Sequence, residues 1–150
     1  MIRYRRDLDN YQFYNTPTEI SYWSEVDEDK LQTAIDLFNK EIKWDRMWNV
    51  EDAKKRLEQG RLMVVLEIDD KLRGWYWLNY ETQEAENLYV HEDFRNKGYG
   101  FGIISYIITA AKVRQLDHVG ARVDEWNKTS QRLFERCGFK DVGRIYEPGG

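Results

Sequence analysis

The segment at residues 95–100 contains residue types that bind phosphate groups. Its two glycines let the backbone approach a ligand closely, and its arginine and lysine attract negative charge. Residues 84–91 before it alternate as a strand does, and apolar residues at 103, 104, 107, 108 and 111 recur at helical spacing. Free N–H groups and the dipole at a helix N-terminus favour anions. The sequence therefore predicts a phosphate-binding turn between a strand and a helix.

Two common phosphate-binding motifs do not match this turn. The dinucleotide pattern G-x-G-x-x-G fails because Ile103 stands at the position of the third glycine, and the P-loop pattern fails because no Gly-Lys-Ser/Thr occurs. What remains is Arg-x-x-Gly-x-Gly, preceded by Leu88-x-Val90 and followed by an amphipathic helix. Simple alternation in the preceding strand places Glu86, Leu88 and Val90 on one face and Ala85, Asn87 and Tyr89 on the other.

Composition and charge exclude several classes of protein. The chain has 150 residues, of which 41% are hydrophobic, so we expect residues 1–150 to form a single domain with a real core. The net charge of −4 argues against a nucleic-acid-binding protein. Cys137 is the only cysteine and there are two distant histidines, so we expect neither a disulfide nor a metal site. Without a membrane span or a signal-peptide core after Met1, we expect a cytoplasmic protein.

The remaining chain predicts an α/β fold, a mixed sheet with helices on its faces. Asp27, Asn49 and Asn127 have the residue types that cap helix N-termini, and Gly60 and Gly138 the type that ends helices. Residues 1–17 show no clear period, so we expect an N-terminal extension or an irregular edge element there. We expect strands at residues 20–23, 62–68, 72–80, 84–91, 119–124 and 141–146, with helices after residues 27, 49, 100 and 127.

A second motif makes the pattern specific. Residues 127–139 contain an asparagine, a small residue, then Leu-Phe-Glu and finally Gly-Phe, one helix and one strand after the first motif. The two motifs in this order resemble the signatures of the GNAT superfamily of N-acetyltransferases, and the resemblance covers residues 18–146. It implies a central, mostly antiparallel, twisted sheet that splays apart after its fourth strand, with helices on both faces.

The resemblance also implies a donor, acetyl-coenzyme A or another acyl-coenzyme A, and an amine as acceptor. The splayed sheet would leave one edge of the key strand unpaired, where the pantetheine arm would bind like an added strand. Asn127 would contact the pantetheine, and Phe134 would reach the sulfur. By the same resemblance Leu88, Tyr89 and Val90 would pair with the pantetheine, and Arg95, Asn96, Lys97, Gly98, Tyr99 and Gly100 would hold the pyrophosphate.

Phe134 departs from the family pattern, which often has a tyrosine at this position. The tyrosine is commonly proposed to protonate the leaving thiolate, and phenylalanine has no proton to give. Either Tyr146, Ser130 or water serves instead, or the thiolate leaves unprotonated. Phe134 is also compatible with simple core packing. It supports an alternative function, a non-catalytic acyl-coenzyme A-binding regulatory domain, and a purely structural domain would not bind coenzyme A at all.

Catalysis by this family implies an oxyanion donor and a base. The Val90 amide lies at the point of the strand where relatives polarise the thioester carbonyl. Glu84 matches the base position of the histone-acetylating branch, and Glu86 lies one pleat closer to Val90. Both glutamates are equally compatible with solvated hairpin residues. Asp124 and His91 are further candidates for the base. The alternatives are a cap or turn role for Asp124 and an exposed loop position for His91.

The acceptor site is expected under the linker between the first two helices, where large aromatic residues gather. They would hold a cationic amine by cation–π contacts, with Asp45 supplying charge. Core packing is the alternative, particularly for the alternating Trp75 and Trp77. Polyamines, amino acids, aminoglycosides, protein N-termini and lysine all remain open as acceptors, and a homodimer is possible. The acceptor residues that we predict are Trp44, Trp48, Trp77 and Trp126.

Overall fold

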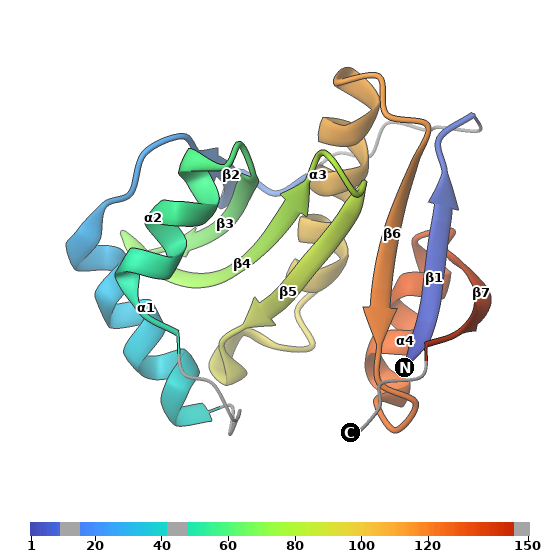
Figure 1. The fold of residues 1–150 in the computed structure, drawn as a ribbon. Helices are drawn as coiled ribbons and strands as arrows, with labels where there is room; N and C mark the ends of the chain where they lie inside the picture. Colours follow the sequence, from blue (N-terminus) through green and yellow to red (C-terminus); the bar gives the residue numbers. More distant parts are fainter. Residues whose placement is uncertain (10–15, 42–47, 146–150) are drawn as a thin grey trace.

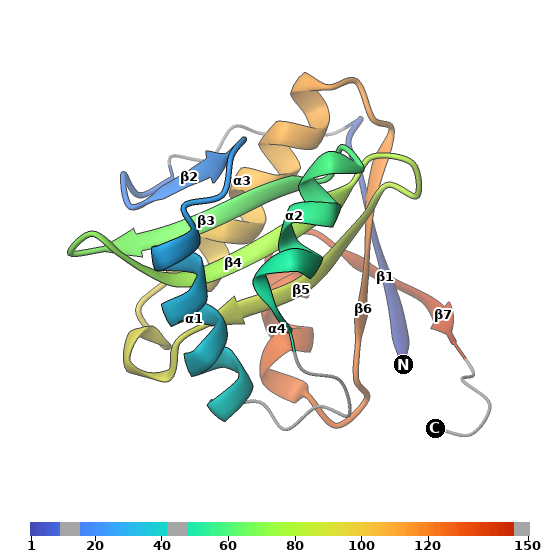
Figure 2. The same cartoon turned by 60° about the vertical axis from the view of Figure 1, so that its left-hand side comes forward.

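The protein, described by a computed structural model over residues 1–9, 16–41 and 48–145, is built on one mixed sheet. The sheet has seven strands in the order β2-β3-β4-β5-β6-β1-β7 (Figure 1). Helices α1 and α2 cover one face and α3 and α4 cover the other, as the rotated view shows (Figure 2). The predicted fold class, a mixed α/β sheet with helices on both faces, is confirmed.

No helix in the described ranges is long and apolar enough to cross a membrane.

The boundaries of the elements follow the sequence patterns closely. The helices are α1 (Glu28–Glu41), α2 (Val50–Glu58), the 3-10 turn η1 (Glu92–Phe94), α3 (Tyr99–Val113) and α4 (Lys128–Arg136). The strands are β1 (Ile2–Asp7), β2 (Ile20–Trp23), β3 (Leu62–Ile68), β4 (Lys71–Asn79), β5 (Glu84–Val90), β6 (His118–Val123) and β7 (Lys140–Arg144).

Three helices begin at the caps that the sequence predicts. The Asn49 side chain accepts a hydrogen bond from the Asp52 N–H at 2.9 Å, and the Asn127 side chain accepts one from the Ser130 N–H at 3.1 Å. Asp27 does the same for Lys30, at 3.2 Å. Each cap satisfies a donor that the helix itself leaves free, and such a cap typically stabilises a protein by about 1 kcal/mol.

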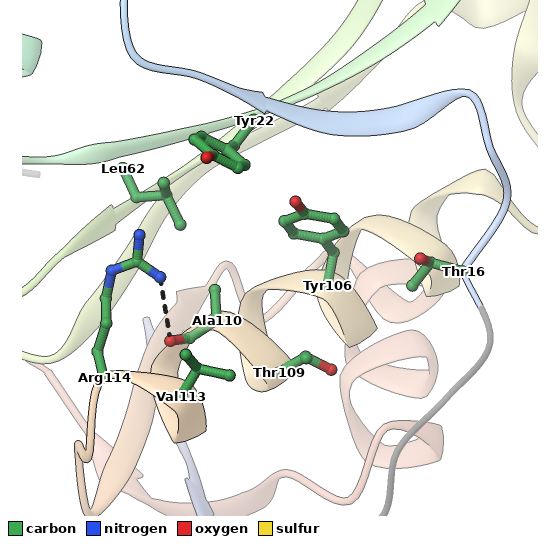
Figure 3. Close-up of a pocket in the computed structure, with 8 residues that line it drawn as sticks. All are labelled: Thr16, Tyr22, Leu62, Tyr106, Thr109, Ala110, Val113 and Arg114. Atoms are coloured by element: carbon green, nitrogen blue, oxygen red, sulfur yellow. Dashed lines mark hydrogen bonds between the residues drawn. The ribbon is translucent and has the colours of Figure 1, made fainter.

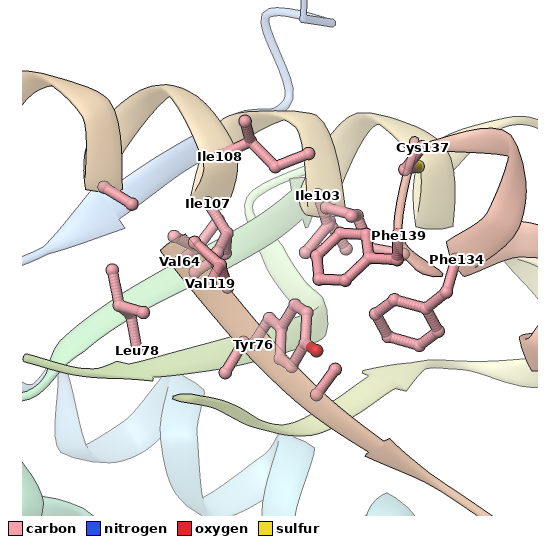
Figure 4. Close-up of a cluster of buried hydrophobic side chains, with 14 of the residues drawn as sticks. Val64, Tyr76, Leu78, Ile103, Ile107, Ile108, Val119, Phe134, Cys137 and Phe139 are labelled. Carbon is pink, nitrogen blue, oxygen red and sulfur yellow. The ribbon is translucent and has the colours of Figure 1, made fainter. Parts of the chain in front are cut away.

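Two apolar layers hold the helices to the sheet. Leu31, Ala34, Ile35 and Phe38 of α1 pack with Trp75 and Trp77 on one face. On the other face, isoleucines of α3 and Phe134 of α4 pack against both halves of the sheet (Figure 4). Strands β3 and β4 are buried on both faces, so they are almost continuously apolar rather than alternating.

The expected N-terminal extension is wrong for residues 2–7, because they form β1 inside the sheet. This strand is antiparallel to β6 on one side, from Ile2↔Val123 to Asp7↔His118, and to β7 on the other. Ile2 and Tyr4 are buried, 4% and 2% exposed, whereas Arg3 and Arg5 are exposed. With only two apolar positions alternating with arginines, the strand carries too short a pattern to be recognised in the sequence.

A bulge in β5 corrects the simple alternation expected there. Trp75 pairs with Tyr89 and Trp77 with Glu86, so Asn87 and Leu88 together oppose a single residue of β4. Asn87 has a φ of 62°, the left-handed conformation that asparagine tolerates better than most residues. Beyond the bulge the faces exchange. The Tyr89 ring therefore packs under α1, while Leu88 and Val90 join Ala85 on the face covered by α3 and α4.

The sheet splays between β5 and β6, as the resemblance implies. Their parallel pairing is confined to Glu84↔Gly120, supported by a hydrogen bond from the Gly120 N–H to the Gln83 carbonyl at 2.8 Å. From that point the two strands diverge toward their C-terminal ends (Figure 1). The edge of β5 that faces β6 is therefore unpaired along most of its length, including Val90.

The buried position of β1 predicts that Tyr4 is essential for stability. Tyr4→Ala should lower the free energy of unfolding by about 3–5 kcal/mol, the usual cost of removing a buried aromatic ring. Arg3→Ala, on the exposed face of the same strand, should change it by less than about 0.5 kcal/mol. Urea unfolding followed by circular dichroism measures both values. Equal, small effects would mean that residues 2–7 are not part of the folded sheet.

Candidate functional site

The backbone of Val90 points into the splay. The His91 N–H donates to the Arg73 carbonyl of β4 at 2.7 Å. Because successive residues of a strand direct their polar groups to alternate edges, the Tyr89 backbone faces β4 and the Val90 N–H and C=O face the open edge. The Val90 carbonyl accepts a hydrogen bond from Arg95 Nε at 2.8 Å. A ligand in the splay therefore meets the Val90 N–H, while the Tyr89 backbone cannot pair with it.

The glycine turn presents the N-terminus of α3 at the end of this gap. Gly98, at the N-cap of α3, has a φ of 86° and makes no side-chain cap. Asn96 also has a left-handed backbone, with a φ of 62°. Residues 95–98 are exposed. The first-turn N–H groups of α3 thus lack a capping side chain and are available to an anion, supported by the helix dipole.

The second motif lies directly against the first. A Cβ atom added at Gly100 would lie 3.0 Å from Leu133 Cδ2, so this glycine permits the close approach of α3 and α4. The Asn127 side-chain oxygen caps α4, which leaves its amide NH2 group as the part available to a ligand. The two motifs, separate in the sequence, therefore form one surface around the end of the splay.

Two residues that the sequence did not single out, Arg73 and Glu41, also lie at this turn. The Arg73 guanidinium lies 5.2 Å and the Lys97 ammonium 5.6 Å from the centre of the Phe94 ring. Glu41, the last residue of α1, contacts Arg95 with 3.1 Å between Oε1 and Nη2. No local sequence signal could have found Arg73 or Glu41, because both reach the turn from distant elements.

The two candidate bases both lie in ion pairs. Glu84 Oε2 lies 3.4 Å from Arg122 Nε. Glu86 Oε2 lies 3.6 Å from Arg56 Nη1 and 3.7 Å from Arg61 Nη1. Glu86 and its two arginines lie on the face covered by α1 and α2, across the sheet from α3. The charge of Glu86 thus compensates two guanidinium groups.

The other two candidates for the base have structural partners. His91 is 9% exposed, and its Nδ1 accepts the Asp93 N–H at 3.3 Å, which caps η1. The Asp124 backbone carbonyl accepts the Asn127 N–H at 3.0 Å in the turn before α4. The Asp124 contact matches the turn role that the sequence left open. The expectation of an exposed loop position for His91 is wrong, because the side chain is buried while it caps η1.

The predicted acceptor residues differ in accessibility. Trp77 is fully buried, and Trp48 packs between Phe38 and Trp77 with the Arg56 guanidinium 4.2 Å from its ring centre. Core packing, the alternative reading, therefore describes Trp77, and the Trp48 ring already holds a cation. Trp126, in contrast, is 77% exposed beside the cap of α4. Trp44 and Asp45 lie outside the described residues.

Phe134 is part of the apolar core. It is 3% exposed and packs between Tyr4, Tyr76 and Phe139, with ring centres 6.1, 6.3 and 5.1 Å away (Figure 4). The packing role that the sequence left open for Phe134 is therefore present. Of the hydroxyls considered as its replacement, Ser130 lies in the first turn of α4, and Tyr146 lies outside the described residues.

A hollow of about 270 Å³ lies elsewhere, between β2 and the C-terminal half of α3 (Figure 3). Tyr22 and Tyr106 face each other across it, and Arg114 closes one side. A helix rises about 1.5 Å per residue, so Tyr106 lies about 12 Å along α3 from the glycine turn. This hollow is separate from the splay and does not contribute to the site around Val90.

Comparisons with known proteins agree with this geometry. Residues 23–139 match the acetyltransferase (GNAT) family. An uncharacterized N-acetyltransferase of Methanocaldococcus jannaschii is 30% identical over 113 residues, covering 69% of this chain and 49% of the relative. A ribosomal-protein-alanine N-acetyltransferase from Brucella melitensis superposes with a TM-score of 0.72 at 20% identity, over 87% and 90% of the two chains.

An aminoglycoside acetyltransferase from an uncultured soil metagenomic sample has the same fold. It superposes with a TM-score of 0.68 at 19% identity, and the superposition covers 96% of this chain and 100% of the aminoglycoside acetyltransferase chain. The chain spans about half the length of the Methanocaldococcus jannaschii relative. With both motifs, the splayed sheet and the family match in place, the chain belongs to the GNAT acetyltransferase family.

The single cysteine is predicted to be unreactive in the folded protein. Cys137 is fully buried, and burial raises the pKa of its thiol to about 12. An unfolded cysteine ionises near a pKa of about 8.5, so the stability linked to the buried neutral thiol is lost as the pH rises from that value toward 12. At pH 8, an aromatic disulfide reagent should modify native Cys137 at least about 100-fold more slowly than the urea-unfolded chain. Rapid modification of the native protein would contradict this burial.

Proposed function

We propose that this protein is an N-acetyltransferase that moves an acetyl group from acetyl-coenzyme A to a primary amine of a small molecule or peptide. Transfer occurs by direct attack in a ternary complex. The observation that carries the proposal is the Val90 N–H, which is directed into the gap between β5 and β6 beside the uncapped N-terminus of α3. Family membership supports acetyl-coenzyme A as the donor.

Each part of the donor would meet a different element of the site. The pyrophosphate would bind the N–H groups at residues 96–100, where Lys97 adds positive charge. The pantetheine would lie along the open edge of β5, against Leu88 and Val90, with Asn127 on its other side. The thioester would then reach Val90. Tyr89 contributes its side chain to the packing under α1 rather than backbone hydrogen bonds to the donor.

The reaction would proceed through a tetrahedral intermediate. The neutral amine nitrogen attacks the thioester carbonyl carbon, a C–N bond forms, and the carbonyl oxygen becomes an oxyanion that the Val90 N–H stabilises. A base takes a proton from the nitrogen, directly or through water. Collapse breaks the C–S bond and releases coenzyme A as a thiolate, which takes its proton from Ser130, Tyr146 or water, or leaves unprotonated.

A non-catalytic acyl-coenzyme A-binding domain is the second candidate function, and Phe134 favours it. The phenylalanine side chain lies in the core where relatives often place a tyrosine, so this chain lacks the family's usual proton donor. Such a domain would bind coenzyme A tightly and release no thiol with any amine. Phe134→Tyr should raise turnover only if the missing proton limits it.

Release of free thiol from acetyl-coenzyme A, measured across a panel of amines, tests the proposed activity directly. The panel should contain polyamines, amino acids, aminoglycosides, peptides with free N-termini and lysine peptides. At least one amine should give catalytic release and an acetylated product of the expected mass. Binding of coenzyme A without any thiol release would support the regulatory alternative, and absence of binding would contradict both.

The glycine turn allows a matched test of donor binding. Gly98 and Gly60 both have left-handed φ angles, 86° and 81°, and an added Cβ would meet nothing within 4 Å at either. Alanine should therefore cost about 1 kcal/mol of stability at both positions. Only Gly98→Ala should also weaken coenzyme A binding, by about tenfold or about 1.4 kcal/mol, because it disturbs the N–H groups of α3. The affinity is obtained from the change in melting temperature with the concentration of coenzyme A. Equal affinities of the Gly98→Ala and Gly60→Ala variants would mean that the donor binds elsewhere.

The choice between the two carboxylates rests on the pH dependence of turnover. Glu84→Gln and Glu86→Gln should be compared with Glu81→Gln, an exposed glutamate in the adjoining turn. Replacing the base should lower kcat/KM by about 100-fold or more and remove the acidic limb of its pH profile. The other variant and the Glu81→Gln control should keep the acidic limb of the pH profile. Unchanged profiles in both would exclude both glutamates as the base.

A further inference from the structure

Glu41 connects α1 to the donor side of the site through both of its carboxylate oxygens. Oε2 accepts the Tyr89 hydroxyl at 2.5 Å, and Oε1 accepts the Glu92 N–H at 3.0 Å. Oε1 also lies 3.1 Å from Arg95 Nη2. The Glu41 side chain is only 14% exposed, whereas its partners Arg95 and Glu92 are exposed. One carboxylate thus joins β5, η1 and the first residue of the glycine motif.

Tyr89 makes this connection rigid. Tyr89 is 4% exposed, and its ring stacks on Trp75 and packs at an angle against Phe38, with ring centres 4.9 and 5.0 Å away. Burial, reinforced by the hydrogen bond to Glu41, raises the pKa of Tyr89 well above its usual value, so the hydroxyl remains a donor throughout the neutral range. The carboxylate is therefore held by a side chain that cannot move without disturbing the core.

Arg95 transmits this position to the backbone of Val90. The same guanidinium that contacts Glu41 donates from Nε to the Val90 carbonyl at 2.8 Å. Arg95 is 48% exposed and would otherwise sample many rotamers. Glu41 restricts it to the one that satisfies the unpaired carbonyl at the open edge. A satisfied carbonyl fixes the Val90–His91 peptide plane, which meets the plane carrying the Val90 N–H at the Val90 Cα atom.

We infer that Glu41 is a positioning residue for acetyl transfer, acting through Arg95 to orient the Val90 N–H toward the thioester oxygen. This inference rests on the proposed function. It predicts a specific division of effects, because an oxyanion donor acts mainly in the transition state. Loss of Glu41 should lower kcat while the N–H groups of the glycine turn continue to bind the donor. Removing the negative charge of Glu41 beside the glycine turn should not weaken binding of the anionic donor.

Glu41→Gln is the informative variant, since it keeps the size of the side chain but replaces one acceptor oxygen by a donor NH2 group. Whichever way the amide is turned, Arg95 loses its charged partner, and either the Tyr89 hydroxyl proton or the Glu92 N–H loses its acceptor. We expect kcat to fall about tenfold, with the dissociation constant for coenzyme A within about threefold of the wild-type value. Glu58→Gln is the matched control, because Glu58 is the exposed last residue of α2 and should leave both values unchanged.

A second readout does not require an acceptor. In protein labelled with ¹⁵N-valine, with the signal assigned through Val90→Ile, acetyl-coenzyme A should shift the Val90 amide resonance. The shift should be smaller in Glu41→Gln, and in Arg95→Gln it should be no larger than in Glu41→Gln. In kinetics, the Glu41→Gln/Arg95→Gln double variant should lose no more activity than Arg95→Gln alone, because both act on the same carbonyl.

The outcomes separate this inference from the proposed function. If Glu41→Gln matches Glu58→Gln in kcat and in the Val90 amide response, the inference is wrong and the proposed function stands. A parallel loss of thermal stability, coenzyme A binding and kcat would assign Glu41 a purely structural role and also overturn it. If the wild-type Val90 amide does not respond to acetyl-coenzyme A and no thiol is released, both fail.

Discussion

The missing hydrogen bonds between β5 and β6 are the feature on which the rest of the site depends. The two strands pair at Glu84↔Gly120 and then separate, which leaves polar backbone groups of β5 without a strand partner. Unpaired backbone groups are costly unless something else satisfies them. Arg95 satisfies the Val90 carbonyl, and the Val90 N–H remains for a ligand. The two halves of the sheet stay together because one apolar cluster under α3 and α4 contains Val64 and Tyr76 from one half and Val119 and Tyr4 from the other.

The bulge in β5 gives the two faces of this strand different tasks. Before the bulge, Glu86 lies among the arginines on the α2 side; after it, Tyr89 occupies that face and Val90 turns its side chain to the opposite core. The extra residue, Asn87, thereby places the Glu86 carboxylate and the Val90 side chain on opposite faces of the same short strand. The glycines of the following turn complete the arrangement, because they let α3 begin at the end of the splay and approach α4 closely.

The parts of the fold that the sequence predicted correctly are those with strong local patterns. The caps at Asn49 and Asn127 and the helix after Asp27 lie where they were expected. β1 was missed because Ile2 and Tyr4 alternate with arginines over too few residues, and its two partners are more than 100 positions away in the chain. The face of Glu86 was wrong because alternation assumes an unbroken strand, and no residue type identifies a bulge at Asn87. In the site, the glycine turn was recognisable from the sequence, whereas Arg73 and Glu41 belong to no sequence motif.

The family and the glycine turn could be read from the amino-acid sequence, because Arg-x-x-Gly-x-Gly and the capped helix at Asn127 depend on backbone geometry within a few residues. The sequence also determined which residues are apolar enough to build the two cores. The tertiary structure alone decided which edges pair, where the sheet opens and which charges meet, such as Glu41 with Arg95 and Glu86 with Arg56. Hydrogen bonds and ion pairs between distant segments form only once packing brings those segments together, and their partners leave no periodic signal in the chain.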